Sequence, residues 1–393
     1  MERIALAAEK LLSNIISFWK GLRDNTCGGF YGYLSQDLVL DKKAEKGCIL
    51  NNRILWFFSE AAMVTGRADL RADADHAYQF LRDHCLDRQL GGVYWSLNYD
   101  GSVLDSTKHT YNQAFALYAL SAYYRLTHSE EALALAMDIF RIIEERCTDR
   151  EGYLEAFAAD WTPGSNEKLS ENGVLADKTM NTLLHVFEGY AGLYQASPDP
   201  AVGQAMRRAL DIFAGRIYDP ALRRQKVFFD KHYNSIIDLY SYGHDIEASW
   251  LMDWGVKLLE DPLLIEKISA IDTQLAQAVY ETAFDGHSVA NECDRGVVDQ
   301  TRTWWVQAES VAGYVNLWEK DKSQIQYRGA AVNIFRYIRD HMVDKRPGSE
   351  WFWCLDPDGS PIPGRPIVEP WKCPYHNGRM CMELIRKDPD IYV

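Results

Sequence analysis

Two histidines lie in segments whose residue types suit proton-transfer chemistry. His244 occurs in Tyr240-Ser-Tyr-Gly-His-Asp-Ile-Glu-Ala-Ser-Trp250, and His376 occurs in Pro370-Trp-Lys-Cys-Pro-Tyr-His-Asn-Gly-Arg379. Histidine can accept or donate a proton near neutral pH, and the aromatic rings close to both histidines are platforms for a sugar or base face. Two such segments in one chain indicate proton transfer on a flat ligand rich in hydroxyl groups.

Glu247 follows His244 by three residues, so the two side chains share one face of a helix. A carboxylate in that position could fix the tautomer of the imidazole and raise its basicity. The same pair could instead belong to a metal site, but no His-Glu-x-x-His motif and no cysteine cluster completes a ligand set. We therefore predict no metal; a structural role for His244 in the core stays open.

His376 is predicted to lie in a loop rich in proline and glycine, just before a helix that starts near Gly378. Loops presented by a rigid scaffold often carry function. Trp371 could stack on a sugar ring, although a place in the core is an equal alternative. Of Trp304 and Trp305, we expect one to pack in the core and the other to face the ligand.

Three further polar residues interrupt apolar helical stretches. Arg53 stands at the start of one, where a buried arginine must be paired or must face an anion. His185 alone is typical of a core histidine, but Asn181, one turn earlier, extends a polar stripe on the same face. The other histidines that we considered are predicted on wet faces or in connections, without a function: His76, His84, His128, His232, His287 and His341. Cys373 and Cys381 are predicted to pack.

Composition excludes several classes of protein. The chain has 393 residues, 47% of them hydrophobic, and a net charge of -14, which argues against nucleic acid or an anionic membrane as partner. Charges interrupt the N-terminal apolar residues, so no signal peptide is expected, and no stretch is apolar enough to span a bilayer. Eight scattered cysteines suit a reducing cytoplasm. Neither a glycine-rich nucleotide loop nor a serine nucleophile elbow is present.

Apolar residues recur at helical spacing along most of the chain. Leu70 to Cys85, Leu133 to Cys147 and Val202 to Ile217 have one apolar face each, and Ser129 is a suitable start for the second. Other stretches are apolar nearly all round and are predicted to be buried on all sides: Ile54 to Val64, Tyr111 to Leu126, Thr182 to Tyr194 and Thr303 to Trp318.

Short segments of glycine and aromatic residues recur about every 60 to 75 residues, a period typical of repeated supersecondary units. They begin at Gly28, Gly91, Gly152, Lys226, Val289 and Glu350. Six alternations of half-wet and fully buried helices predict an all-α fold, an (α/α)₆ barrel, with these segments as hairpin-like connections. We expect residues 1–393 to form one catalytic domain.

In such a barrel, the N-terminal ends of the inner helices surround a central funnel. The site candidates at these ends are Asn52, Arg53, Tyr111, Asn112, Asn181, His185, His244, Glu247, Trp304 and Trp305, with His376 before the last inner helix.

Six segments, in order along most of the chain, together resemble the N-acylglucosamine 2-epimerase family. They are Asn52-Arg-Ile-Leu-Trp-Phe-Phe, Lys108-His-Thr-Tyr-Asn-Gln-Ala-Phe, Asp177-Lys-Thr-Met-Asn-Thr-Leu-Leu-His185, Tyr242-Gly-His-Asp-Ile-Glu-Ala-Ser-Trp-Leu, Trp304-Trp-Val-Gln-Ala-Glu and Trp371-Lys-Cys-Pro-Tyr-His-Asn-Gly-Arg. The last three are the more specific, and the similarity is greatest to members that act on a disaccharide.

The resemblance implies a cofactor-free (α/α)₆ barrel that inverts carbon 2 of the reducing-end sugar of a β-1,4-linked disaccharide such as cellobiose, lactose or mannobiose. His244 and His376 match the family's general acid/base histidines, Arg53 and His185 its arginine and third histidine, and Glu247 the carboxylate that supports the first histidine. The substrate-binding positions match Tyr111, Asn181, Trp304 and Trp371. We expect a disaccharide as partner and favour a monomer.

Three alternatives stay open. An N-acylglucosamine 2-epimerase or a mannose isomerase would use a monosaccharide. An inverting glycoside hydrolase on the same barrel would need two opposed carboxylates, for which Asp105, Glu155, Asp160 and Glu247 are available. A glycan-binding or protein-binding module without catalysis would keep the tryptophans but would not need the two histidines.

Overall fold

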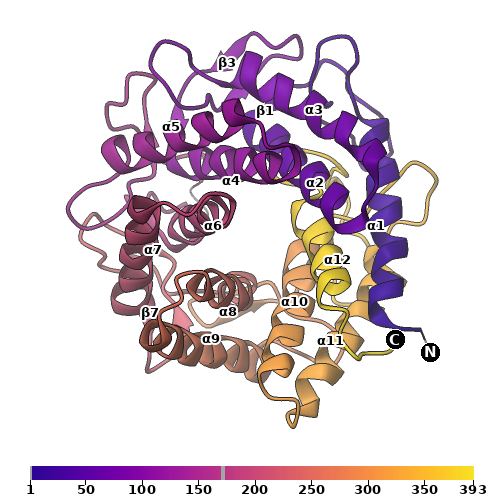
Figure 1. The fold of residues 1–393 in the computed structure, drawn as a ribbon. Coiled ribbons are helices and arrows are strands. Elements are labelled where there is room, and N and C mark those ends of the chain that lie inside the picture. The colour runs from indigo at the N-terminus through magenta and orange to yellow at the C-terminus, as the bar shows by residue number, and fades with distance from the viewer. Residues whose placement is uncertain (1, 170–172) are drawn as a thin grey trace.

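Twelve α-helices form two concentric rings in the computed structural model, which describes residues 2–169 and 173–393 (Figure 1). The inner ring consists of α2 (Cys48–Thr65), α4 (Thr110–Thr127), α6 (Met180–Ala196), α8 (Tyr242–Lys257), α10 (Trp304–Lys320) and α12 (Tyr375–Lys387). The outer ring consists of α1 (Ile4–Gly21), α3 (Arg71–Phe80), α5 (Glu130–Arg146), α7 (Pro200–Ile212), α9 (Pro262–Thr282) and α11 (Ile325–Tyr337). This arrangement confirms the predicted (α/α)₆ barrel.

The sequence pattern predicts helices that are buried on all sides and helices with one buried face, and the structure contains both kinds. In α2 and α4 every residue from the first turn to the penultimate turn is buried, because outer helices and the two neighbouring inner helices pack around each of them. In α5 and α7 the buried residues recur along one face only. Ser129 caps α5 as predicted, since its side chain accepts a hydrogen bond from Ala132 N. The hydrophobic core therefore lies between the rings and inside the inner ring.

The ring is closed by the two ends of the chain. Each inner helix packs against the next, and α12 packs against α2. The outer cover of α12 is α1, from the other end of the sequence. Backbone hydrogen bonds join the ends, with Ile4 N donating to Ile391 O and Val393 N donating to Glu2 O. The six helix pairs consequently form one uninterrupted circle.

The glycine and aromatic segments make local hairpin-like bridges, as predicted, for example Leu86 with Val93 and Thr148 with Tyr153, and the short strands near them also pair with more distant residues. Each strand that follows an outer helix is antiparallel to the short strand that leads into the preceding inner helix. These pairs are β1 (Lys46–Gly47) with β2 (Ser96–Leu97), β4 (Lys108–His109) with β5 (Ala156–Phe157), β6 (Lys178–Thr179) with β9 (Phe228–Phe229), β10 (Leu239–Ser241) with β11 (Glu292–Asp294), and β13 (Arg302–Thr303) with β14 (Cys354–Leu355).

Three shorter elements extend this pattern. β3 (Val103–Asp105) pairs with β2, β12 (Val297–Asp299) pairs with β11, and β7 (Tyr218–Asp219) pairs with β8 (Arg224–Gln225). In place of a sixth strand pair, Leu34 bridges to Val368 ahead of α12. The turn η1 (Ala68–Leu70) precedes α3, and π-helical turns end three outer helices: η2 (Leu81–Cys85), η3 (Phe213–Ile217) and η4 (Ile338–Met342).

Ion pairs made by buried basic side chains fix the starts of the inner helices. Lys46, Lys108 and Lys178 each stand two residues before an inner helix, and their ammonium groups lie 2.7, 2.8 and 2.8 Å from Asp24, Asp87 and Asp149. Arg302 repeats the pattern before α10, at 2.8 Å from Asp285. Each aspartate also accepts backbone N–H groups within its own loop. Tyr240 stands at the corresponding position before α8.

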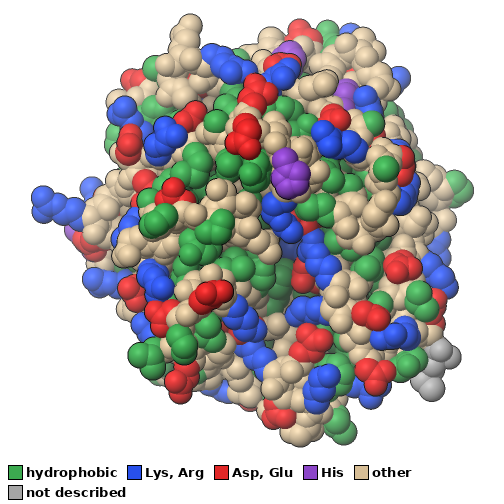
Figure 2. Space-filling view, viewed as in Figure 1, with side chains coloured by type: hydrophobic (Ala, Val, Ile, Leu, Met, Phe, Trp, Pro, Cys, Tyr) green, Lys and Arg blue, Asp and Glu red, His purple; other side chains and the backbone are tan. Residues whose placement is uncertain are grey.

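On the face shown in Figure 2, acidic and basic side chains are intermixed. Within the described residues, no helix is both long enough and apolar enough to cross a bilayer.

Candidate active site

A cavity of about 260 Å³ lies where the inner helices begin. All nine residues predicted to act or to bind ligand line it: Arg53, Tyr111, Asn181, His185, His244, Glu247, Trp304, Trp371 and His376. Asn52 and Asn112, also proposed from their position at helix starts, are buried and bond to each other instead, with Asn52 Nδ2 donating to Asn112 Oδ1 at 3.2 Å. The barrel thus gathers side chains from all six inner helices and, with Trp371, from the segment before α12.

Three histidines of the cavity are held in the same way, through Nδ1. His376 Nδ1 is 2.7 Å from Glu309 Oε1, His185 Nδ1 is 2.8 Å from Glu188 Oε2, and His244 Nδ1 is 2.6 Å from Ser241 Oγ. No hydrogen-bond partner for Nε2 of these rings is recorded among the described residues. The Nε2 atoms are therefore available to a ligand.

Glu247 does not support His244, so that prediction is wrong. The hydroxyl of Ser241 occupies His244 Nδ1. Glu247 Oε1 instead accepts a hydrogen bond from Arg379 Nη2 of α12 and lies 3.7 Å from His376 Nδ1. The spacing along α8 places Glu247 on the same face as His244. The carboxylate nevertheless bonds to the guanidinium of Arg379, which is a stronger partner than a neutral imidazole.

A histidine and a glutamate three residues apart do bond to each other elsewhere in the chain. They are His185 and Glu188. The sequence repeats the same three-residue offset at both places. Glu188 was not selected from the sequence because it stands in a helix that is otherwise apolar. That setting was itself the available signal, since a carboxylate is rarely buried unless it is paired.

Arg379 lies among three buried carboxylates below the cavity. Its guanidinium donates to Glu188 at 2.5 Å, to Glu309 at 2.6 Å and to Glu247. None of these four side chains is more than 2% exposed. Glu309 was missed with Glu188, although it belongs to the Trp304-Trp-Val-Gln-Ala-Glu segment. The network fixes Glu309, and through it the ring of His376.

The environment keeps both catalytic candidates neutral near pH 7. Burial, with a smaller effect of His185, lowers the pKa of His244 to about 3. Burial and the charge of Arg379 hold the pKa of His376 well below its usual range. Burial and the nearby Glu309 raise the pKa of Glu247 to about 7. A neutral imidazole has a lone pair on one nitrogen, so each ring can accept a proton from a ligand.

Glu247, Glu309 and His376 could also be considered as a metal site. Their ligand atoms lie within 4.8 Å of one another. Arg379 Nη2, however, already bonds to both carboxylates and supplies the positive charge at this point. The donor set is therefore matched to a guanidinium.

Arg53 is buried with no carboxylate partner recorded among the described residues. Its guanidinium donates to Tyr111 Oη at 2.6 Å, lies 3.9 Å from Cys373 Sγ, and covers the ring of Phe115 at 4.1 Å. Its Nε atom has no hydrogen-bond partner in the described part of the chain. A buried arginine that faces a cavity without a counter-charge is suited to an oxyanion. Cys373, predicted only to pack, also contacts this group, and burial raises the pKa of its thiol.

Aromatic side chains form the walls. Both Trp304 and Trp305 line the cavity, so the expectation that only one would do so is wrong. The ring of Trp305 lies 4.7 Å from that of His244 and 5.5 Å from that of His376, between the two histidines. Trp371 lies 6.0 Å from Tyr111. Buried Trp304 Nε1 and Asn181 Oδ1 have no partner among the described residues and are free to bond to ligand hydroxyls.

His376 is the second residue of α12, which begins at Tyr375 rather than near Gly378. The prediction of a loop is therefore wrong, because Pro374 precedes the helix and is compatible with a helix start. Gly378 faces Phe57 of α2, with room for no side chain: an added Cβ would lie 2.6 Å from that ring. The glycine serves close packing of two inner helices.

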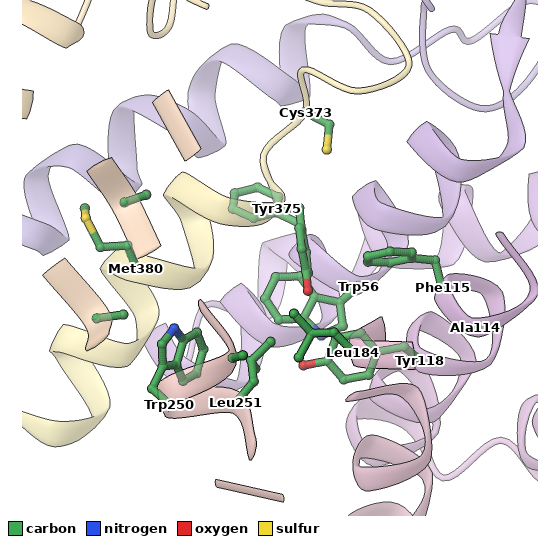
Figure 3. Packing of buried hydrophobic residues seen from close by; sticks show 14 of the residues in the cluster. Trp56, Ala114, Phe115, Tyr118, Leu184, Trp250, Leu251, Cys373, Tyr375 and Met380 are labelled. Carbon is green, nitrogen blue, oxygen red and sulfur yellow. The ribbon is translucent and has the colours of Figure 1, made fainter. Parts of the chain in front are cut away.

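The barrel axis below the site is filled. Figure 3 shows Tyr375 of α12 with Phe115 of α4 and Trp56 of α2, and the ring centroids of Tyr375 lie 5.0 Å from Phe115 and 5.2 Å from Trp56. The cavity is thus a pocket with an aromatic floor and not a channel through the ring.

The other carboxylates considered for hydrolysis lie outside the cavity. Asp105 pairs with Lys168, Glu155 is buried against Thr179 and Thr182, and Asp160 is exposed next to Thr162. Among the described residues that line the cavity, Glu247 is the single acidic one.

Comparison with known proteins gives a consistent picture. The model of the N-acylglucosamine 2-epimerase (GlcNAc 2-epimerase) family matches residues 29–377. The chain is 49% identical to a cellobiose 2-epimerase of Eubacterium cellulosolvens, over 98% of each chain. Its structure superimposes on a sugar epimerase from a ruminal bacterium with a TM-score of 0.97 at 44% identity, covering 99% of this chain and 100% of that one. A cellobiose 2-epimerase of Bacillus thermoamylovorans gives 0.95 at 40% identity, covering 98% and 99%.

Proposed function

The chain belongs to the N-acylglucosamine 2-epimerase family, and from this premise we propose that it inverts carbon 2 of the reducing-end sugar of a β-1,4-linked disaccharide. Cellobiose would become glucosyl-mannose, and lactose and mannobiose would also be substrates. The observation that carries the proposal is one cavity with three histidines that leave Nε2 free, beside a buried arginine without a carboxylate partner. The relatives named cellobiose 2-epimerase support the choice of substrate.

Ring opening comes first, because the proton on carbon 2 is acidic only when carbon 1 is an aldehyde. A base removes the proton of the anomeric hydroxyl, an acid protonates the ring oxygen, and the bond between carbon 1 and that oxygen breaks. His185, His244 and His376 line the cavity from different helices and can exchange protons at these two oxygens.

Epimerisation then needs one proton removed from carbon 2 and one returned to its opposite face. One of His244 and His376 accepts the first proton on Nε2, and the aldehyde oxygen becomes the oxyanion of an enediolate. The other histidine is at that point the imidazolium formed when it took the anomeric proton during ring opening. It delivers this proton to the second face, which restores the aldehyde and leaves the ring neutral. Arg53 and Tyr111 would stabilise the oxyanion, since both face the cavity and Arg53 lacks a counter-charge. The roles of the two histidines exchange when the reaction runs backwards.

The remaining lining residues would hold the sugar rings. Trp371 and Trp304 offer aromatic faces, and Asn181 Oδ1 and Trp304 Nε1 offer unpartnered polar atoms. All chemistry in this scheme is proton transfer, so none of its steps requires a cofactor.

A substrate panel tests the proposal directly. Cellobiose, lactose, mannobiose, mannose and N-acetylglucosamine are each incubated with the protein, and the products are separated by chromatography. We expect 2-epimers of the disaccharides. Conversion of mannose or N-acetylglucosamine alone would favour the monosaccharide enzymes, and release of glucose from cellobiose would favour a hydrolase. Binding of cellobiose without product would favour a glycan-binding module.

Removal of metal gives a second test. Activity is expected to survive exhaustive chelation, because Arg379 provides the cation that the carboxylates of the site require. Loss of turnover that a divalent cation restores would contradict the metal-free scheme.

We also propose that the protein acts as a monomer in a reducing cytoplasm. Seven of its eight cysteines are buried thiols, and the eighth is partly buried. Light scattering of the purified protein would give the oligomeric state.

A further inference from the structure

Ser241 stands at the N-cap of α8 but does not cap the helix. A serine at this position normally accepts a hydrogen bond from a backbone N–H of the first turn. Thr179, at the N-cap of α6, does so, accepting from Thr182 N at 3.0 Å. The Ser241 hydroxyl makes no such bond and lies 2.6 Å from His244 Nδ1. The hydroxyl therefore bonds to the imidazole instead of capping the helix.

His244 differs from His376 and His185 in that its Nδ1 partner is a hydroxyl and not a carboxylate. His376 and His185 are each held by a carboxylate that also receives the N–H of Arg379. Arg379 favours the ionised form of both carboxylates, and an ionised carboxylate only accepts hydrogen bonds. Nδ1 of those rings then carries the proton, and Nε2 of the neutral ring carries the lone pair. A hydroxyl both donates and accepts. His244 therefore has both neutral tautomers available.

Resting on the proposed function, we propose that Ser241 is a positioning residue that gives His244 both neutral tautomers. When Ser241 accepts from Nδ1–H, Nε2 has its lone pair towards the cavity and can take a proton from carbon 2. When Ser241 donates to Nδ1, Nε2–H can donate to an oxygen of the sugar. The change between them is a rotation of the hydroxyl and a shift of the ring proton, with no net gain or loss of protons.

This freedom fits the position of His244 in the cavity. Its ring packs against Trp305 at 4.7 Å, which keeps its plane fixed while Ser241 changes the direction of the hydrogen bond. Ser241 itself lines the cavity, next to the start of α8. The backbone of Ser241 is held independently by the pairing of β10 with Glu292 of β11, so the hydroxyl is placed without the help of the cap.

The test combines turnover with the tautomer of the ring in the protein labelled with ¹⁵N-histidine. We expect the His244 nitrogens of the wild type to show a mixture of tautomers and those of His376 and His185 a single one, with Nε2 unprotonated. In Ser241→Ala the His244 signals should change. The kcat should fall about 10-fold to 100-fold with little change in KM, comparable to the loss when the partner of a metal-bound histidine is removed.

Two further variants separate positioning from a structural effect. Ser241→Thr retains the hydroxyl and should restore kcat to within a few-fold of wild type. Ser249→Ala, on the same helix, removes a buried hydroxyl that donates to Ile246 O, and should leave kcat and the His244 signals unchanged. Turnover of Ser241→Ala at the wild-type rate, or unchanged His244 signals in it, would overturn this inference. Absence of turnover by the wild type on every sugar of the panel would overturn the proposed function instead.

Discussion

At the scale of single residues, the partner on Nδ1 decides what each histidine of the cavity can do. Glu309 and Glu188 fix the rings of His376 and His185, and Ser241 holds His244. The low pKa of His244 and of His376 leaves both neutral, which is the state in which an imidazole accepts a proton. The positive charge that the three buried carboxylates share comes from Arg379 and not from the histidines.

Replacement of His376 by Asn should reduce kcat by about 100-fold to 10,000-fold, the usual contribution of a general acid or base. An asparagine amide can still donate to Glu309, so the buried carboxylate keeps a partner and the fold should be retained. Steady-state kinetics and thermal unfolding check both parts. His128→Asn is the matched control, because this histidine is exposed and its φ of 55° is one that asparagine tolerates. A His376→Asn protein with wild-type turnover would remove His376 from the mechanism.

Much of the site could be predicted at this scale, because unusual residue types stand at the starts of apolar helices. The hydrogen-bond partner of each side chain could not be predicted. Glu247 and His244 share a face of α8, but Arg379, 132 positions away, binds the carboxylate. Only the closed ring brings α12 to that point. Ser241 was missed because a serine before a helix has an ordinary explanation as a cap.

At the scale of elements, the starts of the inner helices are the most firmly positioned part of the fold. Short strands and the ion pairs of buried lysines with aspartates hold them in place, and the catalytic candidates follow within the first turns. The helices themselves could be predicted from apolar periodicity, which is local. The Lys108–Asp87 pair could not, since it joins residues 21 positions apart across a loop whose course the periodicity does not define.

Gly243, next to His244, allows α8 to approach α10. A Cβ at this position would lie 2.4 Å from the ring of Trp305, which contacts both His244 and His376. We expect Gly243→Ala to displace this ring and to lower kcat/KM by about 100-fold, as small misplacements in an active site do.

Gly329 of α11 provides the control, because a Cβ there meets no atom within 4 Å. Gly329→Ala should leave kcat/KM unchanged and stabilise the protein by about 0.5–1 kcal/mol. Wild-type kcat/KM in Gly243→Ala would show that the position of Trp305 is not critical.

At the scale of the whole molecule, the closed ring determines both the cavity and its stability. α1 covers α12, and the inner ring is complete only when the two ends of the chain meet. The six repeats predicted this architecture from the sequence, but the way in which the ring closes depends on pairing between residues at opposite ends of the chain. One carboxylate buried between α8, α9 and α10 makes that stability sensitive to pH.

Asp272 of α9 is 1% exposed, and both of its carboxylate oxygens lack a partner among the described residues. Burial raises the pKa of Asp272 well above its usual value, with Lys320 opposing and Asp253 adding to the effect. The folded protein therefore keeps this carboxyl protonated, while the unfolded chain releases the proton above about pH 4. Folding stability is lost as pH rises through this range, up to the folded-state pKa.

Asp272→Asn should accordingly raise the free energy of unfolding at pH 7 by about 1–3 kcal/mol and should have little effect at pH 4. Urea unfolding at both pH values measures the difference. Asp211→Asn, on the exposed surface of α7, should be close to neutral at both. Equal effects of Asp272→Asn at the two pH values would contradict a protonated carboxyl.

The central claim is that carbon 2 loses one proton and receives another from a second histidine. Turnover of cellobiose in deuterated water, followed by NMR of the glucosyl-mannose formed, tests it most directly. Since both histidines exchange with solvent, we predict that the product carries deuterium at carbon 2. A 2-epimer that fully retains its original hydrogen at carbon 2 would contradict transfer between two histidines.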